Sequence, residues 1–274
     1  MISRFDRLKT CSEQSQGTRR NSALKKAVIL AAGKGTRMGA LTDGVSKPMI
    51  AVSGKPILEW IVTGLAAAGS KEFLIVTGYR AETVESYFKD GARWNVAISY
   101  IRQLKQDGTG RVVELARDWT DGNPFLLSYG DILVADEVYR ALFSGWRRSH
   151  WDGMLTVKLG EDVRHGGSAI FDDEFCLREL VEKPGDAELK ALRAQFGDFK
   201  HWYNAGIYVF TPWIFEYTAR LRPSARGEYE LTDAIRQMAY DGLRLKGQAI
   251  EGFWMDVRDP AALAEANARL SGGK

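Results

Sequence analysis

A glycine-rich loop with fixed positive charges follows the first apolar run of the chain. Gly33 and Gly35 lie in the segment AAGKGTRM, and the residues Arg37 and Lys47 follow within the next twelve positions. Glycines let backbone N–H groups approach an anion closely, and the two cations supply the charge that a polyanion requires. The loop therefore indicates a triphosphate site, although a tight turn with incidental basic residues would read similarly.

Other glycine motifs and histidine chemistry fit this chain poorly. A P-loop needs Gly-Lys-Ser/Thr after four intervening residues, and this loop does not supply them. A dinucleotide fingerprint needs a third glycine at the position of Met38, which disfavours a nicotinamide-dependent oxidoreductase. The three histidines His150, His165 and His201 are scattered, which argues against a catalytic triad or a histidine metal site.

The elements that position the loop alternate between buried strands and amphipathic helices. Continuous apolar runs predict strands covered on both faces at Lys26–Ala32, Phe73–Thr77, Val96–Ile101, Phe125–Tyr129 and Met154–Leu159. Helical patterns cover Pro56–Ala68, Ala81–Phe88, Asp136–Arg148, Glu188–Phe196 and Asp233–Tyr240, and a last helix is expected after an Asp259 cap, with Gly272 beyond its end. This alternation predicts a single-domain, Rossmann-like, doubly wound α/β fold with a mostly parallel sheet.

An aspartate stands where such a fold forms its ligand crevice. Asp131 follows the buried run Phe125–Tyr129, at the carboxyl end of the expected strand. A carboxylate that emerges there must be solvated, paired or bound to a metal. By itself, Asp131 could equally be a turn residue.

The segment AAGKGTRMGALTDGVSKPMIAVSGKPILEW resembles the opening of the sugar-1-phosphate nucleotidyltransferases, or sugar-nucleotide pyrophosphorylases, whose pattern is AAGxGTRLxPLTxxxPKPMxxVxxKP. The similarity extends over residues 26 to about 271 and favours the glucose-1-phosphate thymidylyl- and uridylyltransferases. Met38, Ala40 and Ser46 depart from the pattern, and these departures change loop stiffness rather than charge. The resemblance implies an enzyme that joins a nucleoside triphosphate to a sugar 1-phosphate and releases pyrophosphate.

The resemblance also implies a nucleotide site. Gln103 and Gly108, in the segment Tyr100–Ala116, match positions that contact the nucleobase in the family. An edge strand and a turn would be the reading of that segment taken alone. The implied nucleotide-binding residues are Ala32, Gly33, Gly35, Thr36, Gln103, Gly108 and Thr109.

The resemblance places catalytic, metal-binding and sugar-binding roles on the remaining motifs. Asp131 and Asp256, the latter in the segment GFWMDV, match the aspartates that hold Mg²⁺. Glu182 and Asn204, in VEKP and YNAGIY, match residues that contact sugar hydroxyls. The implied catalytic residues are Arg37, Lys47 and Lys183. No general base is required, because a phosphomonoester with a second pKa of about 6 is already an anion near neutral pH.

The charge distribution argues against a nucleic-acid-binding body. The formal net charge is +3, but residues 1–26 hold seven Lys/Arg against Asp6 and Glu13, so the rest of the chain is slightly acidic. Residues 1–24 are polar and aperiodic, and we expect a disordered basic extension before a nucleotidyltransferase domain at 25–274.

No apolar run approaches the roughly 18 residues of a membrane helix, so we expect no membrane partner. The two cysteines, Cys11 and Cys176, are interpreted as incidental thiols of a cytoplasmic protein. No hexapeptide-repeat pattern follows the family motifs, so an acetyltransferase half is not expected. Composition leaves a homo-oligomer open.

The substrates and a non-catalytic role stay open at this stage. UTP or dTTP with a hexose 1-phosphate fits Gln103 best, while GTP- or CTP-dependent relatives that use hexose or heptose 1-phosphates share most motifs. A non-catalytic, sugar-nucleotide-binding regulatory subunit could adopt the same fold, because fold alone does not decide function.

Overall fold

A computed structural model describes residues 23–147 and 150–271 of the chain. The basic extension expected over residues 1–24 lies, up to residue 22, outside the described residues, as does Gly272. The described chain begins close to the body of the fold, since Leu24 is already buried in the core.

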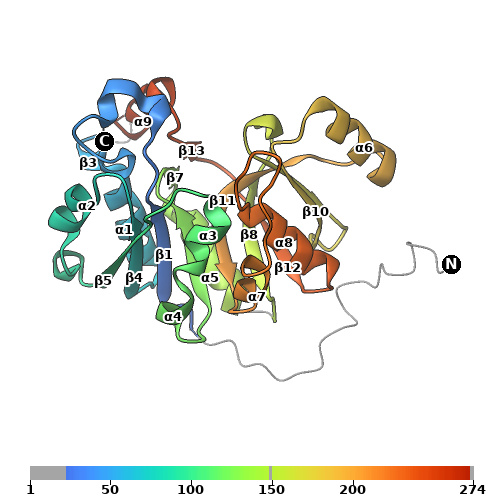
Figure 1. Ribbon diagram of the computed structural model, residues 1–274, viewed down its shortest axis with the longest axis horizontal. Coiled ribbons are helices and arrows are strands. Elements are labelled where there is room, and N and C mark those ends of the chain that lie inside the picture. Colours follow the sequence, from blue (N-terminus) through green and yellow to red (C-terminus); the bar gives the residue numbers. More distant parts are fainter. Residues whose placement is uncertain (1–22, 148–149, 272–274) are drawn as a thin grey trace.

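A nine-stranded mixed sheet forms the centre of the described chain (Figure 1). Its order is β10-β9-β11-β6-β1-β4-β5, with β8 beside β11 and β12 beside β8. The strands are β1 (Lys26–Ala31), β4 (Glu72–Thr77), β5 (Ala97–Arg102), β6 (Phe125–Tyr129), β8 (Gly153–Lys158), β9 (Gly167–Phe171), β10 (Leu177–Glu182), β11 (Trp202–Phe210) and β12 (Leu245–Ala249). Two small pairs lie apart from it, β2 (Ala51–Val52) with β3 (Lys55–Pro56) and β7 (Ile132–Val134) with β13 (Trp254–Asp256).

The first half of the sheet is parallel and its second half is largely antiparallel. Strands β6, β1, β4 and β5 run parallel, and β12 is parallel to β8. Strand β11 runs antiparallel to β6, β8 and β9, and β10 runs antiparallel to β9. Consequently, the carboxyl ends of β1, β4, β5 and β6 meet at one edge, where ligand crevices form in such sheets.

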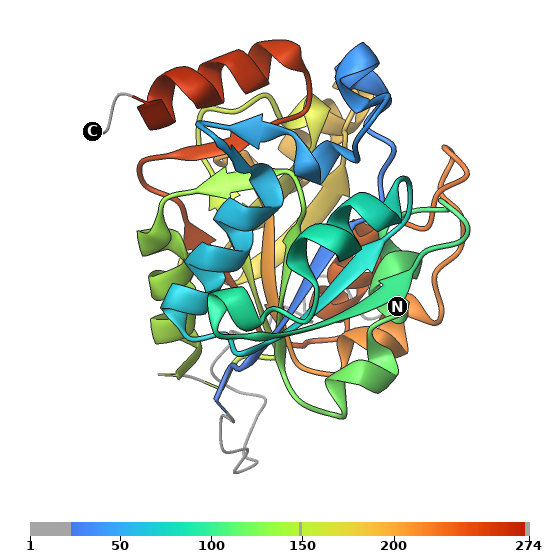
Figure 2. The same ribbon diagram turned by 90° about the vertical axis from the view of Figure 1, so that its left-hand side faces the viewer.

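Helices cover both faces of the sheet, which confirms the doubly wound α/β fold (Figures 1 and 2). Residues alternate along β1, so that Ala27 and Ile29 pack into one apolar cluster and Val28 into the other. The first cluster includes side chains of α1, α2, α5 and α9, and the second includes side chains of α3, α7 and α8. The helices are α1 (Ile57–Ala68), α2 (Ala81–Phe88), α3 (Thr109–Glu114), α4 (Arg117–Thr120), α5 (Asp136–Arg147), α6 (Asp186–Phe196), α7 (Ile214–Thr218), α8 (Leu231–Tyr240) and α9 (Pro260–Ser271). Short 3₁₀ segments lie at η2 (Thr36–Thr42), which is kinked at Gly39, and at η3 (Lys47–Met49), η4 (Ala92–Trp94) and η5 (Val163–His165).

The expected elements all exist, with small shifts at their ends. Asp259 caps α9 as expected, because its Oδ1 accepts from the Ala262 N–H at 2.9 Å. Helix α8 begins two residues before Asp233, and its first N–H, that of Leu231, donates to Thr109 Oγ1 at 3.2 Å. The helix expected at Asp233–Tyr240 is therefore longer at its amino end than the sequence predicts.

Candidate active site

The glycine loop leaves β1 at the carboxyl edge of the sheet. Gly35 has φ +66°, and a Cβ at this position would lie 2.7 Å from Lys47 Cβ. A larger residue would therefore displace the lysine stem, so glycine is required both for the backbone conformation and for the close approach. Arg37 is exposed in η2, and its charge lowers the pKa of Asp256, which places the guanidinium within electrostatic reach of that carboxylate.

Lys47 forms an ion pair with Asp131 beneath this loop. The lysine is only 8% exposed, and its Nζ lies 2.6 Å from Asp131 Oδ2. The sequence analysis predicts a catalytic role for Lys47, at the reacting phosphates. In the structure its ammonium compensates the Asp131 carboxylate.

The small strand pair β7–β13 brings Asp131 and Asp256 together from 125 positions apart in the chain. Asp256 pairs with Ile132, the residue after Asp131, and the Val257 N–H donates to Asp131 O at 3.0 Å. Trp254 Nε1 donates to Ala205 O at 2.9 Å, which holds β13 against β11. The two aspartates are thus neighbours because of backbone pairing rather than through chance side-chain contact.

Electrostatics couple the two carboxylates. Burial and, after it, the charge of Asp131 raise the pKa of Asp256 to about 6, whereas the charge of Lys47 acts in the opposite direction. Two partly buried carboxylates that repel each other are a fitting donor set for Mg²⁺, which takes one or two carboxylates and completes its shell with waters and substrate phosphates. Within 23–147 and 150–271, no group of three or more His, Cys, Asp and Glu could hold a metal alone, so substrate oxygens would have to contribute.

The segment expected to contact the nucleobase follows β5 and docks on the loop before α8. The Gln103 N–H donates to Thr77 O at 2.8 Å. A Cβ on Gly108, which has φ +115°, would lie 2.5 Å from both the nitrogen and the oxygen of Tyr229. The Tyr229 N–H in turn donates to Asp107 O at 2.8 Å. Gly108 therefore has a structural reason to be glycine in addition to any contact with a base.

One residue of this segment escaped the sequence interpretation. Gln106 Nε2 donates to Ala32 O at 2.9 Å, and the Tyr79 N–H donates to the same carbonyl at 3.2 Å. The glutamine amide thus joins the expected nucleobase segment to the start of the glycine loop. A polar residue in a turn carries no signal for a contact 74 positions away, so only the structure reveals this link.

The expected sugar-binding residues lie at the ends of β10 and β11. Lys183 follows β10 in a left-handed backbone conformation, with φ +44°, and its Nζ lies 3.9 Å from Glu182 Oε1. Burial raises the pKa of Glu182, an effect that the Lys183 charge opposes. Arg226, which the sequence interpretation also missed, lies 4.0 Å from the same Glu182 oxygen and 2.8 Å from Glu230 Oε1.

Asn204 carries an unsatisfied buried acceptor. Its Nδ2 donates to Tyr208 OH at 2.7 Å, whereas its Oδ1 has no hydrogen-bond partner in the part of the chain that the structure describes. A buried amide oxygen without a partner is costly, and a ligand hydroxyl would satisfy it. This geometry suits the hydroxyl-binding role that the resemblance implies.

Tyr203 lies between the two groups of residues. Burial and then the charge of Asp256 raise its pKa, and Glu182 contributes in the same direction. Its ring contacts that of Trp254 edge to face at 5.3 Å. The expected metal ligands and the expected sugar ligands therefore lie within electrostatic reach of a single phenol.

The edge of the doubly wound sheet thus brings together the glycine loop, two neighbouring aspartates and the buried Lys47. The family model described as nucleotidyl transferase matches residues 26–272, and the chain belongs to this family. The resemblance found in the sequence motifs is thereby confirmed.

Similar proteins carry names from sugar-nucleotide metabolism. The chain is 35% identical over 244 residues to bifunctional protein GlmU of Methanocaldococcus jannaschii, covering 89% of this chain and 54% of that protein. It is 30% identical over 242 residues to glucose-1-phosphate thymidylyltransferase of Streptomyces griseus, covering 88% of this chain and 65% of that protein. The chain thus spans about half the length of the GlmU relatives. A crystal structure of a putative glucose-1-phosphate thymidylyltransferase from Bacillus anthracis superposes with a TM-score of 0.78 at 25% identity, over 89% of this chain and 94% of that one.

No helix of the described residues is both long and apolar enough to cross a membrane.

Proposed function

We propose that this chain transfers a nucleoside monophosphate from a nucleoside triphosphate to a sugar 1-phosphate and releases pyrophosphate. UTP or dTTP with a hexose 1-phosphate is the favoured pair, in keeping with Gln103 and with the thymidylyltransferase name among the relatives. The observation that carries the proposal is the β7–β13 pairing, which sets Asp131 and Asp256 side by side next to Lys47 and the glycine loop.

The reaction is an in-line displacement at the α-phosphorus. A sugar-phosphate oxygen forms the new bond to that phosphorus while the bond to the pyrophosphate oxygen breaks. Gly33, Gly35 and Thr36 offer backbone N–H groups to the triphosphate, and Arg37 neutralises its outer phosphates. Lys183 approaches the sugar phosphate, while Glu182 and Asn204 Oδ1 accept from sugar hydroxyls. Catalysis is then positioning combined with charge neutralisation.

Asp131 and Asp256 would hold a Mg²⁺ that neutralises phosphate charge near the reacting centre. Lys47 holds the Asp131 side chain in place in the absence of substrate through their ion pair, in which Nζ and Oδ2 are 2.6 Å apart. The Asp131–Asp256 repulsion gives the ligand-free site an electrostatic reason to attract a cation.

A pyrophosphate-release screen tests the proposal directly. Purified protein is combined with UTP, dTTP, GTP, CTP or ATP and with a panel of hexose and heptose 1-phosphates, with Mg²⁺ or with EDTA. We expect one NTP and sugar pair to release pyrophosphate in a Mg²⁺-dependent manner. Failure of every pair would favour a sugar-nucleotide-binding regulatory subunit, for which binding without turnover would be the positive signature.

Matched variants separate chemistry from folding. Asp131→Ala and Lys183→Met should reduce turnover at least a hundredfold while the protein still unfolds cooperatively, because oriented charges of this kind are worth several kcal/mol in the transition state. Lys71→Met is the control, since Lys71 is exposed and precedes β4 at the opposite end of the sheet. Wild-type pyrophosphate release by either active-site variant would refute the mechanism.

A further inference from the structure

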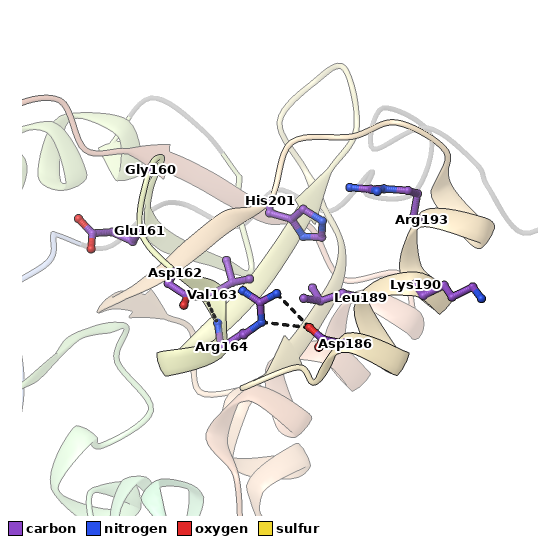
Figure 3. Close-up of a pocket in the computed structure, with 10 residues that line it drawn as sticks. All are labelled: Gly160, Glu161, Asp162, Val163, Arg164, Asp186, Leu189, Lys190, Arg193 and His201. Atoms are coloured by element: carbon purple, nitrogen blue, oxygen red, sulfur yellow. Dashed lines mark hydrogen bonds and ion pairs between the residues drawn. The ribbon is translucent and has the colours of Figure 1, made fainter.

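A second cleft lies outside the candidate active site, between the turn that follows β8 and helix α6 (Figure 3). Its volume is about 610 Å³, which falls within the range of small-molecule sites. One wall is the turn from Gly160 to Arg164, the other is the inner side of α6, and His201 closes one end. None of these residues belongs to the nucleotide or sugar contacts proposed above.

The floor of the cleft is rigid and partly apolar. Val163 is buried, and Leu189 packs against the main apolar cluster. Arg164 is already neutralised, because its Nη2 and Nε donate to Asp186 Oδ1 at 2.9 and 3.2 Å and its Nη1 lies 3.4 Å from Asp162 Oδ1. These contacts join the β8 turn to the first turn of α6.

Arg193 is a cation of the cleft whose charge is not balanced by an ion pair among the described residues. Its side chain has no ion pair or hydrogen bond with any residue that the structure describes, and Figure 3 shows this side chain directed from α6 across the cleft toward His201. His201 Nδ1 lies 2.9 Å from Ser168 Oγ. When the serine hydroxyl donates to Nδ1, the ring proton is on Nε2 and becomes a second donor. Glu161 carries the opposing charge at the far rim, and Figure 3 shows it directed away from Arg193.

We propose that this cleft binds an oxyanion, a phosphate or a carboxylate, through Arg193 and His201, with the organic part of the ligand on Val163 and Leu189. Arginine is suited to this role because its planar guanidinium donates two parallel hydrogen bonds to such a group. Arg193 is exposed on α6 and its guanidinium has no ion pair among the described residues, so it is available to a ligand, while Ser168 holds the His201 ring in place.

The cleft also has a structural connection to the sugar side of the site. The carbonyl of Gly166, which ends the same turn, accepts from the Lys183 N–H. A Cβ on Gly166 would lie 2.4 Å from Tyr203 OH, so the turn also packs against the phenol between the two sets of expected ligands. The oxyanion could therefore be a free ligand beside the sugar site or an acidic substituent of the sugar. The binding of an oxyanion in this cleft does not depend on the proposed function; only the choice between a free ligand and a sugar substituent does.

Calorimetric titration with inorganic phosphate tests the cleft without any turnover. The background is Arg37→Met/Lys183→Met, which removes the two exposed cations expected to contact phosphate at the active site. We expect phosphate binding to persist there and to weaken at least about tenfold when Arg193→Met is added, because a hydrogen bond to a charged group is worth about 1.5–3 kcal/mol. Arg193→Lys should retain part of the affinity.

Lys190→Met is the matched control, because Lys190 is on the same helix and Figure 3 shows it directed away from His201. It removes the same charge and should change phosphate affinity less than twofold. Equal phosphate affinity in the background with and without Arg193→Met, or an equal loss with Lys190→Met, would overturn the proposal. Thermal unfolding of each variant should be unchanged, since Arg193 makes no ion pair to lose.

Kinetics with a hexose 1,6-bisphosphate and the matching hexose 1-phosphate then identify the source. A rise in KM that Arg193→Met causes only for the bisphosphate assigns the cleft to a substituent of the sugar. If Arg193→Met has the same effect on KM for both sugars and the titration shows phosphate binding, the cleft is assigned to a free ligand. Absence of turnover with both sugars would count against the proposed function, and the phosphate titration would still decide whether the cleft binds an oxyanion.

Discussion

Replacing Lys47 by methionine should destabilise the ligand-free protein through Asp131. The ammonium and the carboxylate oxygen are 2.6 Å apart, with side-chain exposures of 10% and 29%. At an effective dielectric constant of about 20, the attraction at that separation is about 6 kcal/mol. Desolvation of two partly buried charges offsets several kcal/mol of this attraction. We therefore expect a net coupling of about 2 kcal/mol.

The neighbouring aspartate makes the two single variants unequal. Lys47→Met leaves the carboxylates of Asp131 and Asp256 facing each other without the cation, whereas Asp131→Asn removes the pair and the repulsion together. The methionine variant should therefore lose about 2–3 kcal/mol of unfolding free energy, and the asparagine variant about 1 kcal/mol. Adding Asp131→Asn to Lys47→Met should restore part of the loss.

Urea denaturation in EDTA at pH 7.5, followed by circular dichroism, measures all four corners of this double-mutant cycle. Lys71→Met is the control for loss of an exposed charge and should change the unfolding free energy by less than about 0.5 kcal/mol. Single-variant losses that add to within about 0.5 kcal/mol would show that the two side chains are not coupled and would refute the reasoning.

Three further outcomes follow from particular contacts. Burial raises the pKa of the Glu182 carboxyl above its ordinary value of 4.5, so the folded protein is stabilised when this carboxyl is protonated. That stabilisation is lost as the pH rises through the raised pKa. Glu182→Gln, which stays neutral, should therefore raise the Tm at pH 7.5 and leave it unchanged near pH 4. Gln106→Ala removes the hydrogen bond to Ala32 O and should raise KM for the nucleoside triphosphate about fivefold, with kcat within about twofold, in steady-state pyrophosphate assays. Gly108→Ala would drive a methyl group to within 2.5 Å of the Tyr229 backbone and should cost about 2 kcal/mol or more in thermal unfolding, and an unchanged Tm would contradict the docking described for this segment.

The parallel half of the fold could be predicted because each of its strands gives a clear signal in the sequence. The runs at β1, β4 and β6 are continuously apolar, as expected for strands covered on both faces, and all three exist within one residue of the expected ends. The antiparallel half gives weaker signals. Strand β10, for example, mixes buried and half-buried positions without a regular pattern and carries the buried Glu179, whose carboxylate pairs with Arg236 at 2.6 Å. A charged residue inside a strand hides it from a reading based on apolar runs.

Some residues of the candidate site could likewise be predicted from the sequence, and others could not. Motif spacing singled out Gly35, Lys47 and Asp131, and the structure places these three residues next to one another. The ion pair between the lysine and the aspartate joins residues 84 positions apart, and no pattern in the sequence announces it. Gln106 and Arg226 were missed for a related reason, because each acts through a contact with another loop rather than through a motif of its own.

The β7–β13 pair explains how such dispersed residues can act as one site. Asp131 ends the turn after β6, where the Gly130 N–H donates to Leu30 O, so its position is tied to β1 and thereby to the glycine loop. Asp256 is tied to Asp131 by the strand pair and to β11 by the Trp254 hydrogen bond. Since β11 also carries Asn204, a continuous series of hydrogen bonds, with the Trp254 side chain as one link, runs from the glycine loop through both aspartates to the expected sugar contacts. Trp254→Phe, which removes one hydrogen bond and little volume, should therefore impair Mg²⁺ and sugar 1-phosphate binding together. A loss of only one of them would show that the two halves of the site are positioned independently.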